Sequence, residues 1–266
     1  MTTTSLSKAS LPALRRTLVA AAIASASAGG WAANPQFTIN PAGAIDPVTS
    51  PVGLNGTPAV ADAFNLSDVS TVTLNGPTFT ETGFLPVQSL LLNNSTVLTP
   101  GLNTTYGLYF AFSGSGTTPN PVGTLNATYQ LYGYNGSAAT FGFNPSHVPT
   151  INGSTAPIGT LLASGATTTP GTVLSFNNTN VTSVDLSFSR TNPAGTGFFP
   201  LPLTFYNRAN ANFSNGPANV TSFNGGFEIN GGSGSFIFAP VPEPETYAMM
   251  LAGLVAVGFV AKRRKI

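Results

Sequence analysis

The chain has no cysteine, and it has one histidine and one tryptophan in 266 residues. The absence of cysteine excludes disulfides, a thiol nucleophile and a lipid-modified N-terminal cysteine. One histidine without any cysteine also excludes a zinc site with several His or Cys ligands. His147 stands between Pro145 and Pro149, which predicts a surface turn, and no Gly-x-Ser-x-Gly motif accompanies it. We therefore expect neither a catalytic residue nor a cofactor, and no enzyme activity.

Charge is equally scarce, at 6% of all residues. Residues 33–240 contain two arginines and six carboxylates, which leaves a net charge of −4 with His147 neutral. Nucleic acid is excluded as a partner, because phosphate neutralisation requires clusters of Lys and Arg. Asn, Thr, Ser and Gly must then keep the surface soluble. Such surfaces hydrogen-bond to sugars and to each other, so exopolysaccharide and self-association are the hypothesised partners. The alternative is a secreted β-protein without an adhesive role.

The N-terminus has the organisation of a secretory signal peptide. Lys8, Arg15 and Arg16 form a basic segment, an apolar segment covers residues 18–28, and small residues precede a cleavage site after Ala32. We assign residues 1–32 to this signal and prefer the general secretory route over a twin-arginine route.

Residues 33–240 show the pattern of a β-rich extracellular domain. Short segments alternate polar and apolar side chains and are rich in Val, Thr, Tyr and Phe. The expected strands are 37–40, 71–74, 87–92, 105–112, 127–134, 139–143, 159–163, 173–176, 184–189, 203–206, 227–230 and 235–238. Asn-Gly pairs separate many of them and supply the positive φ that tight turns need. We predict an all-β fold, an antiparallel β-sandwich or related β-architecture. The rival is an outer-membrane β-barrel, which the short strands disfavour.

The C-terminus, residues 241–266, has three parts. Pro242, Glu243 and Pro244 come first and predict an extended connector. An apolar run at 247–261 follows and predicts a transmembrane helix of about 15 residues, shorter than the ~20 that usually span a bilayer. The chain then ends in a basic cluster of Lys262, Arg263, Arg264 and Lys265, which is expected to stay in the cytoplasm. The plain alternative is a single-pass anchor.

These three parts, in this order, closely resemble the PEP-CTERM sorting signal of Gram-negative bacteria. The resemblance implies recognition by an exosortase in the inner membrane, cleavage near the Pro-Glu-Pro triplet, and transfer to the cell surface or extracellular matrix. The membrane would then be a transient partner, alongside the secretion machinery. Such tails are also named an ice-binding protein C-terminal motif, a name that is no evidence of ice binding.

The central region is similar, more loosely, to the flocculation-associated type of PEP-CTERM protein. The similarity lies in the Phe37-Thr-Ile-Asn-Pro start, the block at 101–109 and the Leu-Leu-Ala-Ser-Gly block at 161–165. It implies a role in cell aggregation and exopolysaccharide-based flocs. We therefore expect a structural or adhesive protein of biofilms or flocs. A discrete carbohydrate-binding module is the alternative, and a secreted hydrolase with a carboxylate pair is the third.

Two further groups of residues are site candidates. Asp62, Asn65 and Asp68 space oxygen ligands three apart, which suits Ca²⁺, although the glycine-punctuated pattern of dedicated calcium loops is missing. An ordinary loop cluster is the alternative. Five tyrosines between residues 106 and 134 offer a sugar-stacking face, or else they pack in the core, which we prefer.

Overall fold

The computed structural model describes residues 34–239, except positions 49, 120–121, 177–178 and 204. The predicted signal peptide with its cleavage site at Ala32 lies outside the described residues, as does the predicted tail at 241–266. Among the helices of the described residues, none combines the length and the apolar character that crossing a membrane requires.

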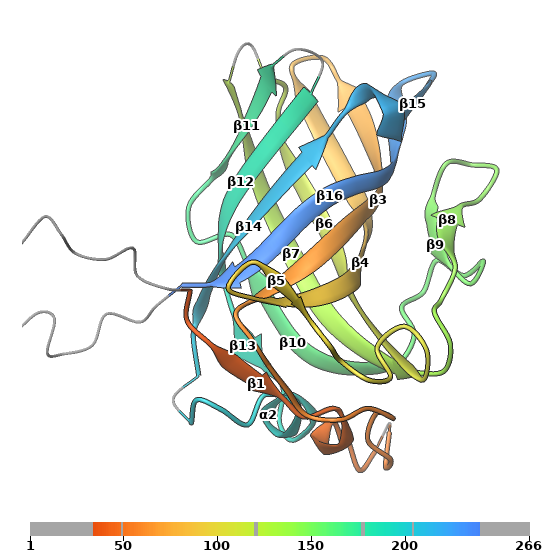
Figure 1. Ribbon diagram of the computed structural model, residues 1–266. Coiled ribbons are helices and arrows are strands. Elements are labelled where there is room, and N and C mark those ends of the chain that lie inside the picture. Colours follow the sequence, from red (N-terminus) through yellow and green to blue (C-terminus); the bar gives the residue numbers. More distant parts are fainter. Residues whose placement is uncertain (1–33, 49, 120–121, 177–178, 204, 240–266) are drawn as a thin grey trace, which may run out of the picture. The chain divides into compact units, whose positions relative to one another are not determined.

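Eight antiparallel strands close into a barrel (Figure 1). The strand order is β11-β12-β14-β16-β3-β4-β6-β7, and β11 also pairs with β7, which completes the circle. The barrel strands are β3 (Ala63–Asn75), β4 (Thr78–Leu92), β6 (Tyr106–Thr117), β7 (Val122–Asn135), β11 (Gly171–Phe176), β12 (Thr179–Ser187), β14 (Arg208–Asn215) and β16 (Gly226–Phe238). The predicted all-β antiparallel fold is confirmed, and the β-architecture is a closed barrel rather than a sandwich.

Shorter elements surround the barrel. Strand β10 pairs with β7, and β13 pairs with β10. Strand β5 pairs with β4, and β15 pairs with β16. Two separate two-stranded sheets, β1 with β2 and β8 with β9, are also present. These elements are β1 (Phe37–Ile39), η1 (Pro41–Gly43), β2 (Ala59–Ala61), β5 (Ser95–Val97), β8 (Phe141–Phe143), β9 (Pro149–Ile151), β10 (Thr160–Ala166), β13 (Ser189–Arg190), α2 (Ala194–Phe198), η2 (Pro217–Asn219) and β15 (Val220–Phe223).

Tight turns join neighbouring strands where the sequence places Asn-Gly. Asn75 pairs with Thr78 across the β3–β4 turn, and Gly76 there has φ +59°. Gly225, with φ +92°, makes the corresponding turn between β15 and β16. Glycine adopts a positive φ at less cost than residues with a side chain, so the predicted turns at these two places are confirmed.

Several strand boundaries differ from the prediction. The segments 227–230 and 235–238 belong to one strand, β16, since the Asn-Gly-Gly between them forms a β-bulge and not a turn. The segment 203–206 is no strand at its described positions. Strands β2, β5, β9, β13, β14 and β15 were not predicted. The long strands were predicted only in part, since β4 has 15 residues and β7 has 14.

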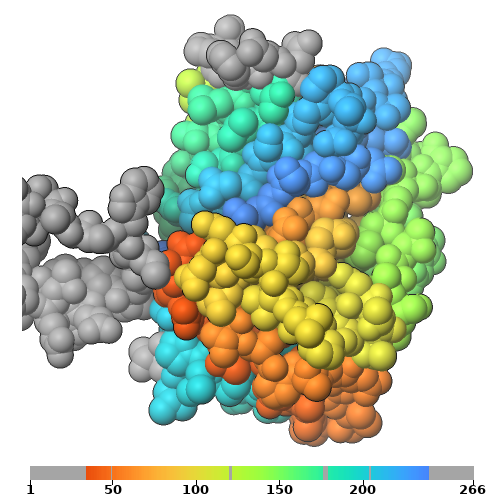
Figure 2. Space-filling view, viewed as in Figure 1, coloured from red at the N-terminus to blue at the C-terminus, as the bar shows by residue number. Residues whose placement is uncertain are grey.

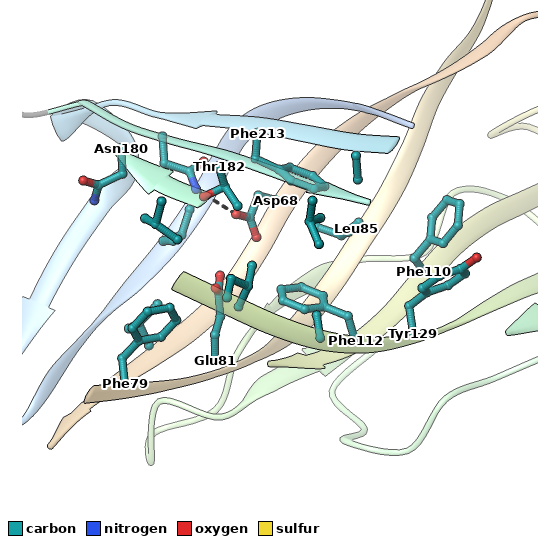
Figure 3. Close-up of a pocket in the computed structure, with 18 of the residues that line it drawn as sticks. Asp68, Phe79, Glu81, Leu85, Phe110, Phe112, Tyr129, Asn180, Thr182 and Phe213 are labelled. Carbon is teal, nitrogen blue, oxygen red and sulfur yellow. Dashed lines mark hydrogen bonds between the residues drawn. The ribbon is translucent and has the colours of Figure 1, made fainter. Parts of the chain in front are cut away.

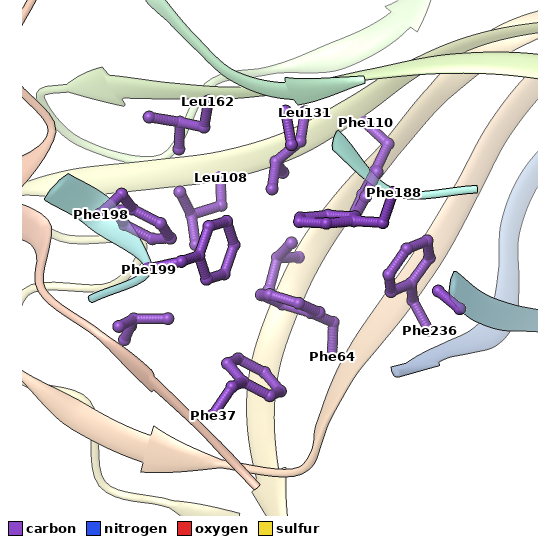
Figure 4. Packing of buried hydrophobic residues seen from close by; sticks show 14 of the residues in the cluster. Phe37, Phe64, Leu108, Phe110, Leu131, Leu162, Phe188, Phe198, Phe199 and Phe236 are labelled. Carbon is purple, nitrogen blue, oxygen red and sulfur yellow. The ribbon is translucent and has the colours of Figure 1, made fainter. Parts of the chain in front are cut away.

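One end of the barrel is filled by aromatic rings from outside the barrel wall (Figure 4). Phe37 of β1 and Phe199, next to α2, are at most 1% exposed and pack against Phe64 of β3. The ring centroids lie 5.1 Å apart for Phe37–Phe64 and 6.4 Å apart for Phe64–Phe199. Phe236 of β16 also packs on Phe64. The N-terminal segment and α2 therefore close this end by apolar burial.

The β8–β9 hairpin covers part of the outer wall. Figure 1 shows it outside the barrel beside β3 and β4, and Figure 2 shows its atoms, in green, on that flank. Phe141 of β8 lies 6.0 Å from the ring of Phe84 and 5.7 Å from that of Tyr109. Phe84, Tyr109 and Ile151 form a small apolar cluster with their neighbours, separate from the barrel core.

Candidate functional site

The alternation along the barrel strands places a group of polar side chains in the interior. On β3, Asp68 and Ser70 share the inward face with Val72. Glu81 of β4 and Asn215 at the end of β14 come from neighbouring parts of the wall. Figure 3 shows Asp68 and Glu81 pointing into one space between the strands. We call Asp68, Ser70, Glu81 and Asn215 the interior polar cluster.

Two hydrogen bonds join the members of the interior polar cluster in two pairs. Asn215 donates from Nδ2 to Asp68 Oδ2 over 2.9 Å. The hydroxyl of Ser70 donates to Glu81 Oε1, also over 2.9 Å. Two oxygens remain without a hydrogen-bond partner although they are buried, Asp68 Oδ1 and Asn215 Oδ1. A buried acceptor without a donor is costly, so these atoms mark the place where a ligand would be held.

A glycine makes room for this cluster. Gly232 follows the bulge in β16, and a Cβ added to it would lie 1.7 Å from Asn215 Oδ1 and 3.2 Å from Asp68 Cβ. Any larger residue would therefore displace Asn215 from Asp68. The bulge brings the backbone of β16 close to the side chains of Asn215 and Asp68. Glycine in a strand commonly permits such a close approach of the backbone.

Burial changes the acidity of both carboxyl groups. Loss of hydration raises the pKa of Asp68 from its ordinary 3.8 to about 6, although the nearby polar side chains of Ser70 and Asn215 act in the opposite direction. Burial, followed by the charge of Asp68, raises the pKa of Glu81 from 4.5 to about 8, and the Ser70 hydrogen bond opposes this. Near neutral pH the two groups together therefore carry about one negative charge and one proton.

The interior polar cluster borders a cavity of about 190 Å³ with apolar walls. Phe79, Leu85, Phe110, Phe112 and Leu125 contribute much of the lining. Thr118 and Asn180 line it near the β6–β7 and β11–β12 connections, at the end of the barrel away from α2. A small apolar pocket with a few convergent polar groups is the usual form of a ligand site.

A second hollow lies on the outer face of the wall, over β6, β7 and β10. It is an open depression of about 610 Å³. Hydroxyl and amide side chains share its lining with Ala111, Phe112, Tyr129, Gly165 and Ala166, and no charged residue is among them. The polar residues are Ser113, Thr128, Gln130, Ser164, Ser187 and Ser189. The hydroxyls of Ser113 and Thr128 lie 3.1 Å apart across two strands. We call this region the hydroxyl depression.

The calcium candidate is distributed along one extended strand. Asp62 immediately precedes β3, and Asn65 and Asp68 lie within it. Asp62 accepts a hydrogen bond from the backbone N–H of Asn93, Asn65 donates to Ser89, and Asp68 belongs to the interior cluster. Six residues of strand span roughly 20 Å, so Asp62 and Asp68 cannot ligate one ion. The described residues also contain no group of three or more His, Cys, Asp or Glu side chains suited to a metal.

His147 lies in the connection between β8 and β9, in a turn as predicted, and φ is +61° there. Its ring stacks on Phe223 with 4.1 Å between centroids, and Nδ1 lies 2.9 Å from Glu228 Oε1. The backbone oxygen of His147 accepts a hydrogen bond from Thr71. These contacts attach the hairpin to β3, β15 and β16, away from the interior polar cluster.

Most of the tyrosines are buried, either inside the barrel or beneath the β8–β9 hairpin. Tyr106 and Tyr109 are 0% exposed, and Tyr129 and Tyr134 are 5% and 7% exposed. Tyr132 is more accessible, and it stacks on Tyr109 with 5.5 Å between ring centroids. The preferred interpretation of core packing is therefore confirmed for four of the five.

Sequence reasoning missed Ser70, Glu81 and Asn215 as members of a site. One signal was available, because Asp68 and Ser70 occupy inward positions of an alternating strand that otherwise carries apolar side chains. Glu81 and Asn215 give no such local signal.

One comparison with known proteins is informative. Residues 240–265 match the family described as the PEP-CTERM protein-sorting motif. Neither a curated protein nor a solved structure matches the chain. Pro242, Glu243, Pro244 and the basic residues 262–265 all fall within the matched segment. The chain therefore carries a PEP-CTERM protein-sorting motif at residues 240–265, which implies an exported protein that an exosortase processes.

Proposed function

We propose that the protein is a non-enzymatic structural or adhesive component of the cell surface or extracellular matrix, active in biofilm or floc formation with exopolysaccharide. The observation that carries this proposal is the hydroxyl depression, a wide polar hollow without charge on the outer wall of the barrel. It belongs to a protein that its tail sends out of the cell. Uncharged hydroxyls and amides match the hydrogen-bonding groups of a polysaccharide.

Each contact of this kind is weak, and adhesion would come from many copies along one polymer. The described residues support such crowding, since they contain few charges to keep copies apart. A discrete carbohydrate-binding module is the second candidate, and a single saturable sugar site would favour it.

The third candidate, a hydrolase, now has a specific carboxylate pair in Asp68 and Glu81. These groups lie inside the barrel beside a cavity of about 190 Å³, which is too small for a polysaccharide chain. This location favours the adhesive function. Turnover of a glycoside that is lost in both Asp68→Asn and Glu81→Gln would reverse the preference.

Sorting is tested by changing Pro242, Glu243 and Pro244 together to alanine in the host cell. We expect the wild type outside the inner membrane, shortened near Val241, and the variant retained with its tail. Glu245→Ala is the matched control, because it removes a neighbouring carboxylate outside the triplet. Unchanged release and mass of the triple variant would contradict exosortase processing.

Adhesion is tested by placing a charge in the hydroxyl depression. Thr128→Glu should reduce binding to the exopolysaccharide of the host and disperse the cells. Thr73→Glu is the control, since Thr73 is also an exposed threonine of the outer wall, on β3. If both variants aggregate and bind as the wild type does, the depression has no adhesive role.

A further inference from the structure

The carboxylates of the interior polar cluster have no cationic partner in the described part of the chain. The guanidinium of Arg190 donates to the backbone oxygen of Phe199 and lies over the ring of Phe205, 4.8 Å from its centroid. Arg208 is exposed, and His147 pairs with Glu228 outside the barrel. None of these three groups lines the cavity. A buried negative charge without a counter-charge is strongly unfavourable, and a bound cation would relieve it.

The acceptors that remain match the donors of one ammonium group. Asp68 is 2% exposed and Asn215 is 7% exposed, and each has one buried oxygen without a partner. Glu81 supplies a third acceptor, and all three residues line the same cavity. A primary ammonium carries three N–H donors, and charge-assisted hydrogen bonds to it are stronger than neutral ones.

The rest of the cavity suits a hydrocarbon. Its walls include the rings of Phe79, Phe110 and Phe112 and the side chains of Leu85 and Leu125. Its volume of about 190 Å³ is somewhat larger than the ~150 Å³ apolar cavity that is known to hold benzene. A molecule of about eight non-hydrogen atoms would therefore fill it. Aromatic rings near a bound cation add further attraction.

We propose that the barrel interior binds a small organic amine, with its protonated amino group at Asp68, Glu81 and Asn215 and its apolar part among the phenylalanines. This ligand site is independent of the adhesive function, which uses the outer face. Leu74, 43% exposed, and Asn180 line the cavity near the β3–β4 and β11–β12 turns, so a ligand enters from that end.

The charge state of the cluster agrees with this ligand. Burial raises the pKa of Asp68 to about 6 and that of Glu81 to about 8, so the pair carries about one negative charge near pH 7. The other titratable group in the cavity lining is Tyr129, whose hydroxyl donates to Ser187 O over 2.8 Å. One monovalent cation therefore balances the site.

The test is calorimetric titration of the purified full-length protein at pH 7 with three probes of one shape: benzylamine, benzyl alcohol and benzoate. We expect benzylamine to bind about 10- to 100-fold more tightly than benzyl alcohol, which corresponds to one charged hydrogen-bonded contact. Benzoate should not bind. Equal affinity for the amine and the alcohol, or no binding of the amine, would overturn the proposal.

Variants and pH locate the site. Asp68→Asn should lose the preference for the amine, while Asp185→Asn should keep it, because Asp185 is an exposed carboxylate of β12 that accepts from Asn210. The pH series needs no variant. At pH 4 both interior carboxyl groups are protonated, so the wild type should lose the amine preference and keep its affinity for the alcohol. Amine binding that is unchanged at pH 4 would place it elsewhere.

Discussion

Raising the pH from about 4 to about 8 is expected to destabilise this barrel, because Asp68 and Glu81 must then ionise in an apolar interior. The pKa of Asp68 is raised from 3.8 to about 6, and that of Glu81 from 4.5 to about 8. The folded state therefore binds more protons than the unfolded chain throughout this interval, and the free energy of unfolding falls as the pH rises. The contribution of the two protonated carboxyl groups to the free energy of unfolding is fully present below about pH 4 and is lost by about pH 8.

The size of the effect follows from the two shifts. One pK unit corresponds to about 1.4 kcal/mol, so the change at Asp68 from 3.8 to about 6 corresponds to about 3 kcal/mol. Glu81 adds to this loss, although the two terms do not sum fully, because part of the shift at Glu81 comes from the charge of Asp68. A total of about 3–6 kcal/mol is large beside the roughly 5–15 kcal/mol that stabilises a typical domain.

The assay is urea unfolding of the purified full-length protein at several pH values, followed by far-UV circular dichroism. Asp68→Asn should resemble the wild type in acid, where both side chains are neutral, and exceed it at pH 8 by about 3 kcal/mol. Asp185→Asn, which changes an exposed carboxylate, should keep the pH profile of the wild type. A wild type that is as stable at pH 8 as at pH 4 would refute the burial of the pair.

Three further predictions concern packing. Gly232→Ala should lower the free energy of unfolding by about 2–4 kcal/mol, measured by thermal unfolding, because the new Cβ lies 1.7 Å from the buried amide oxygen of Asn215. Gly142→Ala is the control, because open space surrounds Gly142, and it should change this free energy little. Phe64→Ala should cost about 3–5 kcal/mol in the same assay, because this 0% exposed ring contacts five others; a loss below 1 kcal/mol would contradict the closed aromatic core. His147→Ala removes the contacts with Glu228 and Phe223 and should cost about 1 kcal/mol, with faster amide hydrogen exchange confined to β8 and β9. Unchanged exchange would show that the hairpin is held by its other contacts.

Some features of the fold could be predicted from the sequence because they depend on residues that are close together in the chain. The alternation of apolar and polar side chains identified the β-class, since successive side chains of a strand point to opposite faces. Asn-Gly pairs at 75–76 and 224–225 marked turns because glycine tolerates positive φ. The sorting motif is also a local signal, written in consecutive residues from Pro242 onward.

Strand β14 shows where local reasoning fails. Its sequence, Arg-Ala-Asn-Ala-Asn-Phe-Ser-Asn, has little intrinsic β-propensity, yet it pairs with β12 on one side and β16 on the other. Pairing on both edges supplies its hydrogen bonds, and burial of Ala209 and Ala211 fits the crowded interior. Tertiary context therefore decides that this segment is a strand, and the same context closes the sheet into a barrel.

The interior polar cluster is likewise a product of tertiary structure. Asp68 and Asn215 lie 147 residues apart in the sequence and meet only because β3 and β14 both flank β16. Sequence alone established an exported, charge-poor β-protein with a sorting tail, because composition and consecutive motifs carry that information. Closure of the barrel decided which polar side chains share the interior. The strand register directs residues that are distant in the sequence toward the barrel axis, where they are removed from water together.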